Sequence, residues 1–331
     1  LQRVEATLAD GVKEMEVLKQ GIEGSKRKVA GFKDAAEKAK LALEAAITAK
    51  AAAAGSRDKA MPVLETLEFS TDGRRLIGAA GEELVLEWSA VTGQGIEPGA
   101  GVEWKLERTL GSGDDKSPIA DRVTSLDFSP DGRTLAVGSG EPSRSGDVTL
   151  WNTASGKLVK TFAELHLDTV LSLAFSPDGS RLASGGADKA VRVLDLKTGK
   201  VGKVFEGHTH HVLGLAWRAD GRMLASAGAD NVVKVWDWVL GDRRKSIDGW
   251  DKEVTALRYV GAADLFATTS GDAKLRLLNS DGVEVKQLAG AADFLNALAV
   301  SSDGELLVAG GQDGVLRLWQ VSTGKELDSF E

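Results

Sequence analysis

Three side chains that together could form a nucleophilic triad lie in one stretch of the chain: His208, Ser226 and Asp230. A catalytic serine needs a hydroxyl that substrate can reach, a base oriented by an acid, and an oxyanion hole. No nucleophile-elbow pattern surrounds Ser226. The sequence therefore favours a structural role for these residues, and we expect the protein not to be an enzyme.

Histidine also gathers at His208, His210 and His211, which raises the question of a metal site. Such a site needs three or four ligands with supporting partners. The chain has no cysteine, and no nearby pair of carboxylates completes the set. We therefore expect no metal and no other cofactor, with His210 and His211 exposed on a loop where a partner can reach them.

The elements that position these residues repeat about every 42 residues from residue 62 onward, a period typical of propeller blades. Each unit has an alternating apolar strand, an Asp-Gly turn, a strand of small residues, and a strand that ends at Trp or Leu. The strand-ending positions are Trp88, Trp151, Leu194, Trp236, Leu278 and Trp319. Alternation followed by Asp-Gly is a hairpin signal, so the pattern predicts an all-β propeller with four-stranded blades.

Six units are visible, and they define a β domain over residues 62–331. The predicted blades cover about 62–110, 121–162, 168–205, 210–247, 252–288 and 294–331. Either six blades close the ring, or the chain supplies six of seven. Each visible unit looks complete and the chain starts inside a heptad, so we favour a seventh unit upstream, with the chain a fragment.

Residues 1–60 follow a different period. Apolar residues such as Leu1, Leu8, Met15, Val4 and Leu18 recur at heptad spacing, which predicts an α-helical coiled coil or helical hairpin. The glycines at positions 21 and 24 would bracket a hairpin bend. Three arrangements remain open: a lone helix on the propeller, an intrachain hairpin, and self-association through residues 1–60.

Charge separates the two regions and limits the partners. Residues 1–60 carry 12 Lys+Arg and 9 Asp+Glu, whereas the remainder carries 29 and 40. An acidic propeller argues against nucleic acid, because phosphate binding requires a basic face. No run of 18 apolar residues exists, so we expect no membrane insertion. The absence of cysteine leaves the compartment open.

The repeated units resemble the WD40-repeat β-propeller family. Gly207-His208 precedes Trp236-Asp237 at the spacing usual in that family. The resemblance implies a structural tetrad of His208, Ser226, Asp230 and Trp236, complete only in the fourth unit. The third unit has Leu194 in place of Trp, and the fifth has Trp250 in place of His.

More loosely, the FSPDGR and STGKEL wording resembles bacterial WD-repeat proteins that carry a coiled coil and an upstream c-type cytochrome domain. That resemblance implies a bacterial protein of the cytoplasm or periplasm, with any targeting signal upstream of residue 1. No Cys-x-x-Cys-His is present, so a haem domain would also lie upstream.

Departures from the regular unit indicate where a partner would bind, since inserted loops on a rigid scaffold tend to carry function. Residues 110–121 form a long acidic connection and residues 141–146 an insertion, and family topology implies that both lie on one face. A third insertion, residues 95–102, is expected on the opposite face. The candidate contacts are Asp114, Asp115, Arg144, His210, His211 and Trp250. Trp250 has a second interpretation, as an apolar replacement for the tetrad histidine.

The sequence thus predicts a non-catalytic scaffold that binds a protein or peptide through a propeller face, with the coiled coil used for docking or oligomerisation. The alternative is an accessory C-terminal module of a larger c-type-cytochrome-containing redox protein.

Overall fold

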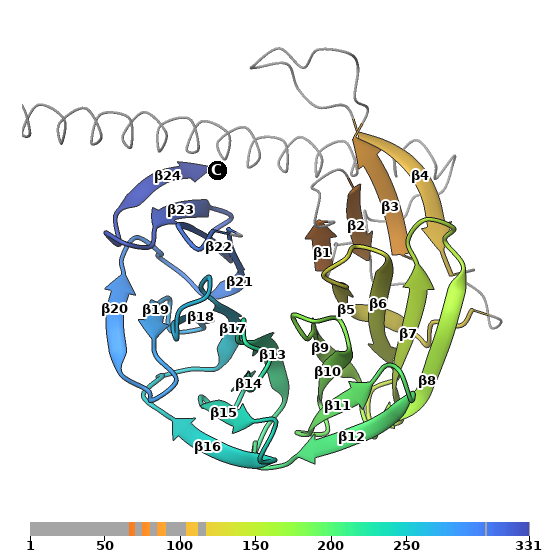
Figure 1. The fold of residues 1–331 in the computed structure, drawn as a ribbon. Coiled ribbons are helices and arrows are strands. Elements are labelled where there is room, and N and C mark those ends of the chain that lie inside the picture. Colours follow the sequence, from red (N-terminus) through yellow and green to blue (C-terminus); the bar gives the residue numbers. More distant parts are fainter. Residues whose placement is uncertain are drawn as a thin grey trace, which may run out of the picture. The chain divides into compact units, whose positions relative to one another are not determined.

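The computed structural model describes residues 66–69, 75–79, 85–90, 104–111, 117–301 and 303–330. In this part of the chain, 24 strands form six four-stranded antiparallel sheets in simple sequence order (Figure 1). These sheets are six four-stranded blades of a β-propeller, as the repeat predicts, and a seventh unit upstream of residue 1 stays a prediction. Blade 1 is β1–β4, and blades 2 to 6 follow in fours. The predicted helical region, residues 1–60, and the insertion at 95–102 lie outside the described residues.

The first strand of each blade lies innermost and the fourth lies at the rim (Figure 1). The innermost strands are β1 (Thr66–Phe69), β5 (Arg122–Phe128), β9 (Val170–Phe175), β13 (Val212–Trp217), β17 (Val254–Tyr259) and β21 (Leu295–Val300). The second strands are β2 (Arg75–Ala79), β6 (Thr134–Gly140), β10 (Arg181–Gly186), β14 (Met223–Gly228), β18 (Phe266–Ser270) and β22 (Leu306–Gly311).

The third strands are β3 (Val85–Ala90), β7 (Gly146–Asn152), β11 (Val191–Asp195), β15 (Val233–Asp237), β19 (Leu275–Leu278) and β23 (Leu316–Gln320). The rim strands are β4 (Trp104–Leu110), β8 (Leu158–His166), β12 (Lys200–Phe205), β16 (Asp242–Ile247), β20 (Glu284–Leu288) and β24 (Glu326–Phe330). No helix among the described residues has the length and apolarity needed to cross a membrane.

The Asp-Gly pairs at 131–132, 178–179, 220–221 and 303–304, which are among the described residues, form turns between the first two strands of their blades. At Asp178-Gly179 the glycine has φ 67°, a conformation that costs glycine little. The Ser176 hydroxyl donates to the Asp178 carboxylate at 2.5 Å, and the Ser180 amide donates to the same carboxylate at 3.0 Å. These hydrogen bonds lower the pKa of Asp178 to about 2. The sequence signal therefore corresponds to a turn closed by its own aspartate.

Small residues in the second strands let neighbouring blades approach. A Cβ added to Gly185 would lie 2.5 Å from Ser172 Oγ and 2.6 Å from Val212 Cγ1. Ser172 belongs to the same blade and Val212 to the next. The space that a side chain at position 185 would need is therefore taken by Ser172 and by the innermost strand of the following blade.

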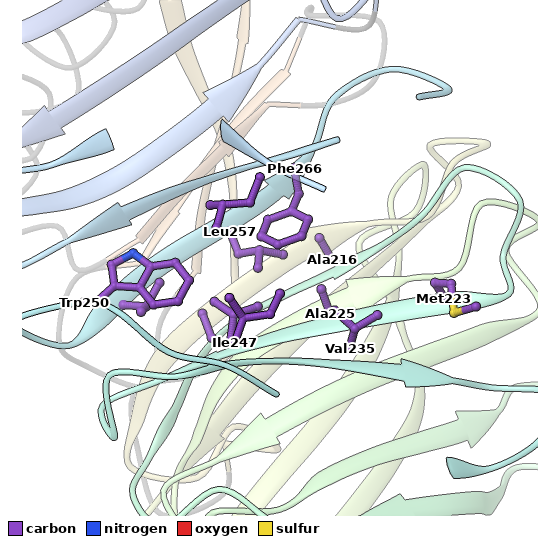
Figure 2. Close-up of a cluster of buried hydrophobic side chains, with 12 residues drawn as sticks. Ala216, Met223, Ala225, Val235, Ile247, Trp250, Leu257 and Phe266 are labelled. Carbon is purple, nitrogen blue, oxygen red and sulfur yellow. The ribbon is translucent and has the colours of Figure 1, made fainter. Parts of the chain in front are cut away.

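Apolar clusters fill the spaces between consecutive blades. Figure 2 shows the cluster between blades 4 and 5, which includes Ala225 and Val235 from one sheet and Leu257 and Phe266 from the other. Phe266 and Leu257 are fully buried. Burial of such side chains contributes about 1.5–3 kcal/mol each, so these clusters carry most of the stability.

Basic side chains on three rim strands, β4, β12 and β20, tie their blade to the next. Arg108 donates to the carbonyl of Ala154 at 3.3 Å, and Lys286 donates to the carbonyl of Ser322 at 2.7 Å. Lys203 donates to the carbonyls of Trp238 and Val239, the latter at 3.1 Å. In each case the acceptor belongs to the turn before the next rim strand. We call these contacts the rim ties.

Candidate interaction face

The four residues of the predicted tetrad come together in blade 4. His208 lies between β12 and β13, Ser226 lies on β14, and Trp236 lies on β15. His208 Nδ1 is 2.9 Å from Asp230 Oδ1, and His208 Nε2 is 2.8 Å from Ser226 Oγ. Trp236 Nε1 donates to Ser226 Oγ at 2.8 Å. One chain of hydrogen bonds thus joins the blade connection, two strands and the turn at Asp230.

Burial decides what this arrangement can do chemically. Ser226 has no exposed surface and His208 is 6% exposed. Ser226 Oγ is occupied by the indole of Trp236 and the ring of His208. Burial raises the pKa of Asp230, but hydrogen bonds from His208 and from the Thr209 amide outweigh it and hold that pKa below its usual value. The geometry is that of a closed hydrogen-bond chain, and a substrate cannot reach its serine.

Blade 3 contains the same chain without its tryptophan. His166 Nδ1 is 2.9 Å from Asp188 Oδ1, and His166 Nε2 is 2.8 Å from Ser184 Oγ. Arg192 donates to Asp188 at 2.7 Å. Burial lowers the pKa of His166, and the carboxylate of Asp188 opposes this shift. The apolar Leu194, 1% exposed, occupies the tryptophan position.

Trp250 is buried in the cluster between blades 4 and 5 (Figure 2), with 6% of its surface exposed. Its Nε1 has no hydrogen-bond partner, and neither has Thr268 Oγ1, which stands at the serine position of this blade. Arg276 lies over the indole, 5.7 Å from the ring centroid, and pairs with Asp272 at 2.8 Å. The structure therefore favours the packing interpretation of Trp250 over that of an exposed anchor for a partner.

The two remaining histidines lie on the loop before β13. Their ring centroids are 4.4 Å apart, and His210 Nδ1 accepts a hydrogen bond from the His211 amide at 2.9 Å. His210 is exposed and His211 half-buried. Burial lowers the pKa of His211, and the charge of His210 adds to that effect. The described residues contain no group of three or more side chains that could hold a metal ion.

Arg144 lies on the β6–β7 loop with 77% of its side chain exposed, and it pairs with Glu141 at 2.7 Å. The amide of Ser143, on the same loop, donates to Asp168 at 2.8 Å. Asp168 in turn acts electrostatically on His211. We name residues 141–146, 167–169, 187–190 and 209–211 the loop face. Asp114 and Asp115 lie outside the described residues.

The sequence reasoning missed an apolar residue on this face. Leu167 is 75% exposed, and its amide donates to Asp188 at 3.1 Å. Thr209 makes the equivalent contact to Asp230 in the next blade. Leu167 directly follows the tetrad histidine His166, so aligning the units on that histidine would have found it.

A second missed group lies on the innermost strands. Glu68, Asp127 and Arg258 each directly precede the aromatic residue that ends their strand. Burial raises the pKa of Asp127 to about 8 and the charge of Glu68 adds to the effect, whereas the amide of Phe175, 2.6 Å from the carboxylate, opposes it. The signal in the sequence was a charge where other units have alanine.

Comparisons with known proteins agree with this fold. The family model described as "WD domain, G-beta repeat" matches residues 108–152, 156–195, 199–237 and 282–320. Nuclear distribution protein PAC1 of Coccidioides posadasii (strain C735) is 34% identical over 224 residues, which are 66% of this chain and 42% of that protein. Small ribosomal subunit protein RACK1 of Medicago sativa is 48% identical over 44 residues, 13% of this chain and 14% of RACK1.

The chain thus spans less than half the length of these relatives. Both relatives are eukaryotic, so the bacterial source stays a prediction without support from them. The four matched repeats agree with the strand pattern and with the hydrogen-bond chain of blade 4. This chain therefore carries WD40 repeats and folds as a WD40-type β-propeller.

Proposed function

We propose that the protein is a non-catalytic scaffold that binds a protein or peptide across the loop face. WD40 propellers bind proteins, and the relatives fit a protein-interaction scaffold. The observation that carries the proposal is Leu167, an aliphatic side chain 75% exposed on a face that also presents Arg144. Hydrogen-bond chains beneath the face hold its backbone in place, since Asp188 fixes the amide of Leu167.

Physical reasoning supports this arrangement. An exposed apolar residue with charged and polar neighbours resembles the centre of an interface, where one buried anchor supplies most of the binding energy. The serines of the two serine–histidine–aspartate sets described above, Ser184 in blade 3 and Ser226 in blade 4, are fully buried. A binding role therefore fits the loop face better than a catalytic one.

The test is affinity capture from cell extract with the immobilised full chain. The double variant Leu167→Ser/Arg144→Ala is compared with Val283→Ser/Arg133→Ala, whose side chains are also exposed but lie away from the loop face. We expect the first variant to lose the captured protein and the second to keep it. Equal capture by both variants would contradict the proposal.

The coiled coil at 1–60 is part of the proposal as a docking or oligomerising element. Substituting Leu8→Asp and Leu18→Asp places charges at its predicted seam. If the coil self-associates, light scattering will show a lower mass for this variant than for the original chain. An unchanged mass would remove self-association through residues 1–60 from the proposal.

The alternative, an accessory module of a c-type-cytochrome-containing redox protein, rests on the sequence motifs of the repeats alone. It predicts a Cys-x-x-Cys-His motif in a longer gene product. Reading the upstream gene sequence decides between the two functions.

A further inference from the structure

Unpaired positive charge collects on the rim of an acidic propeller. The rim strands β12 and β16, with the turns before them, carry Lys197, Lys200, Arg243, Arg244 and Lys245, all exposed. None of these five forms an ion pair with a carboxylate in the described part of the chain. Elsewhere most arginines do pair, as Arg192 does with Asp188.

Exposed aliphatic side chains accompany these charges. Val239 and Leu240 are 65% and 64% exposed, and Val201 and Val204 are 43% and 46% exposed. The rim tie of Lys203 to Val239 joins β12 to the turn that leads into β16. We name the exposed residues of 197–204 and 239–245 the basic rim. Each turn runs directly into its rim strand, and the contacts of Lys203 hold the two segments next to each other.

The basic rim is held rigid from below. The Lys203 ammonium lies 5.0 Å from the centre of the Trp238 ring, and the Arg181 guanidinium lies 5.1 Å from it. A Cβ added to Gly202 would lie 3.0 Å from the same indole. Trp238 is thereby fixed against β12, and it presents Val239 and Leu240 outward. Such preorganisation lowers the entropy cost of binding.

We propose that the basic rim is a docking surface for an acidic segment of a partner protein that also carries aliphatic side chains. The unpaired cations supply charge complementarity, and Val239 and Leu240 supply apolar area to bury. β12 and β16 each lie at the end of their sheet, so an extended segment can also pair with a free strand edge.

Polyanions fit this surface less well. A membrane or a nucleic acid extends beyond the basic rim and meets the remainder of a domain in which acidic residues, counted over all of 61–331, outnumber basic ones by 40 to 29. Single-stranded nucleic acid also needs aromatic side chains for stacking. The large hydrophobic residues exposed in the described structure are all Leu or Val. A short acidic segment avoids both problems.

The test measures binding of fluorescein-labelled peptides to the full chain by fluorescence anisotropy. The probe is a 12-residue peptide of alternating Glu and Val, and its control alternates Glu and Ser. We expect the Glu-Val peptide to bind at least about fivefold more tightly than the Glu-Ser peptide, and its affinity to fall with added salt.

Two double variants locate the site. Lys200→Glu/Arg244→Glu is expected to raise the Kd for the Glu-Val peptide at least about tenfold, and Val239→Ser/Leu240→Ser at least about threefold. The matched control, Lys252→Glu/Lys325→Glu, changes exposed lysines in blades 5 and 6 and is expected to leave the Kd within about twofold. Circular dichroism melting verifies that each variant is folded.

Several outcomes would overturn the proposal. Equal weakening by Lys252→Glu/Lys325→Glu would mean diffuse electrostatics, and preferential binding of phosphatidylserine vesicles or single-stranded DNA would assign the rim to a polyanion. Aggregation of Lys200→Glu/Arg244→Glu with unchanged peptide affinity would mean that the charges only protect strand edges. The loop-face variant Leu167→Ser/Arg144→Ala should bind the peptide normally, which separates this result from the proposed function.

Discussion

Blades 4 and 5 have the same strand order and similar turns, but different side chains hold their parts together. In blade 4, polar groups from the connection, the second strand and the third strand satisfy one another at 2.8–2.9 Å. In blade 5, Trp250 fills the same place with apolar volume, and two buried polar atoms, Trp250 Nε1 and Thr268 Oγ1, have no partner. The difference shows that the blade connection can be held against the second and third strands either by hydrogen bonds or by apolar packing.

The two solutions differ in what a substitution removes. A buried polar group without a partner costs about 1–3 kcal/mol, whereas a satisfied one costs nothing until its partner is deleted. The same chemical change should therefore have opposite effects in the two blades.

Removing the indole of Trp250 should cost the most. We expect Trp250→Ala to lower the free energy of unfolding by about 4 kcal/mol, because it opens a cavity between blades 4 and 5. Trp250→Phe keeps most of the volume and removes the unpaired N–H, so it should cost less than about 1.5 kcal/mol. Urea unfolding measures both. A loss for Trp250→Phe as large as that for Trp250→Ala would refute the packing account.

The hydroxyls at the serine position give the most direct contrast. Ser226→Ala should cost about 2 kcal/mol, since it leaves His208 Nε2 and Trp236 Nε1 without their shared partner. Thr268→Val should instead stabilise by about 1 kcal/mol, because it replaces an unpaired buried hydroxyl with a methyl group. Thermal unfolding of the two variants provides the comparison. If both changes destabilise equally, the distinction between the blades is wrong.

Asp127 extends the contrast to the innermost strands, where Ala174 and Ala216 hold the equivalent positions. Its folded pKa of about 8 lies above that of an unfolded aspartate, about 3.9. The protonated carboxyl thus contributes stability that is fully present below about pH 3.9 and is lost as the pH rises through about 8. Asp127→Asn should raise the unfolding free energy at pH 9 by about 1 kcal/mol, and less at pH 5. Melting curves at both pH values verify the sign.

The smallest effect concerns the turns after the second strand. Ala273 of blade 5 has φ 62°, and Gly314 occupies the same position in blade 6 with φ 72°. Ala273→Gly should stabilise by about 0.5 kcal/mol and Gly314→Ala should destabilise by about 1 kcal/mol. No atom would lie within 4 Å of a Cβ at Gly314, so only backbone strain is tested. Opposite signs are expected in thermal unfolding, and equal signs would exclude strain as the cause.

Much of the fold could be predicted because each unit repeats the same local sequence pattern. Alternation and the Asp-Gly turns are required within one blade, and small second-strand residues such as Gly185 are required where the next blade packs against it. The tetrad residues of blade 4, which the family resemblance implied, are joined by hydrogen bonds in the structure. Exposure could not be predicted so well. Trp250 is an aromatic residue in a loop, and only the packing of Ile247 and Phe266 around it shows that it is buried.

Other contacts had no signal in a single unit. Trp151 finds its partner in Thr149 of its own strand at 2.8 Å, and Trp319 donates to the carbonyl of Ala289 at 2.9 Å. In both blades a different acceptor takes the place of the serine hydroxyl, and the spacing of the repeat does not indicate which one. The basic rim was missed for a different reason, since its charges lie on two units and gather only when the blades stand side by side.

The rim ties described above have a direction, because the donor always belongs to one blade and the carbonyl acceptor to the next. Among these contacts blades 1, 3 and 5 supply the donor and blades 2, 4 and 6 supply the acceptor, so the rim ties join the described blades in pairs. A duplicated pair of blades would carry its own rim tie, whereas a single duplicated blade would carry only the donor or only the acceptor. The rim ties therefore favour the gain or loss of blades two at a time, whatever the loops bind.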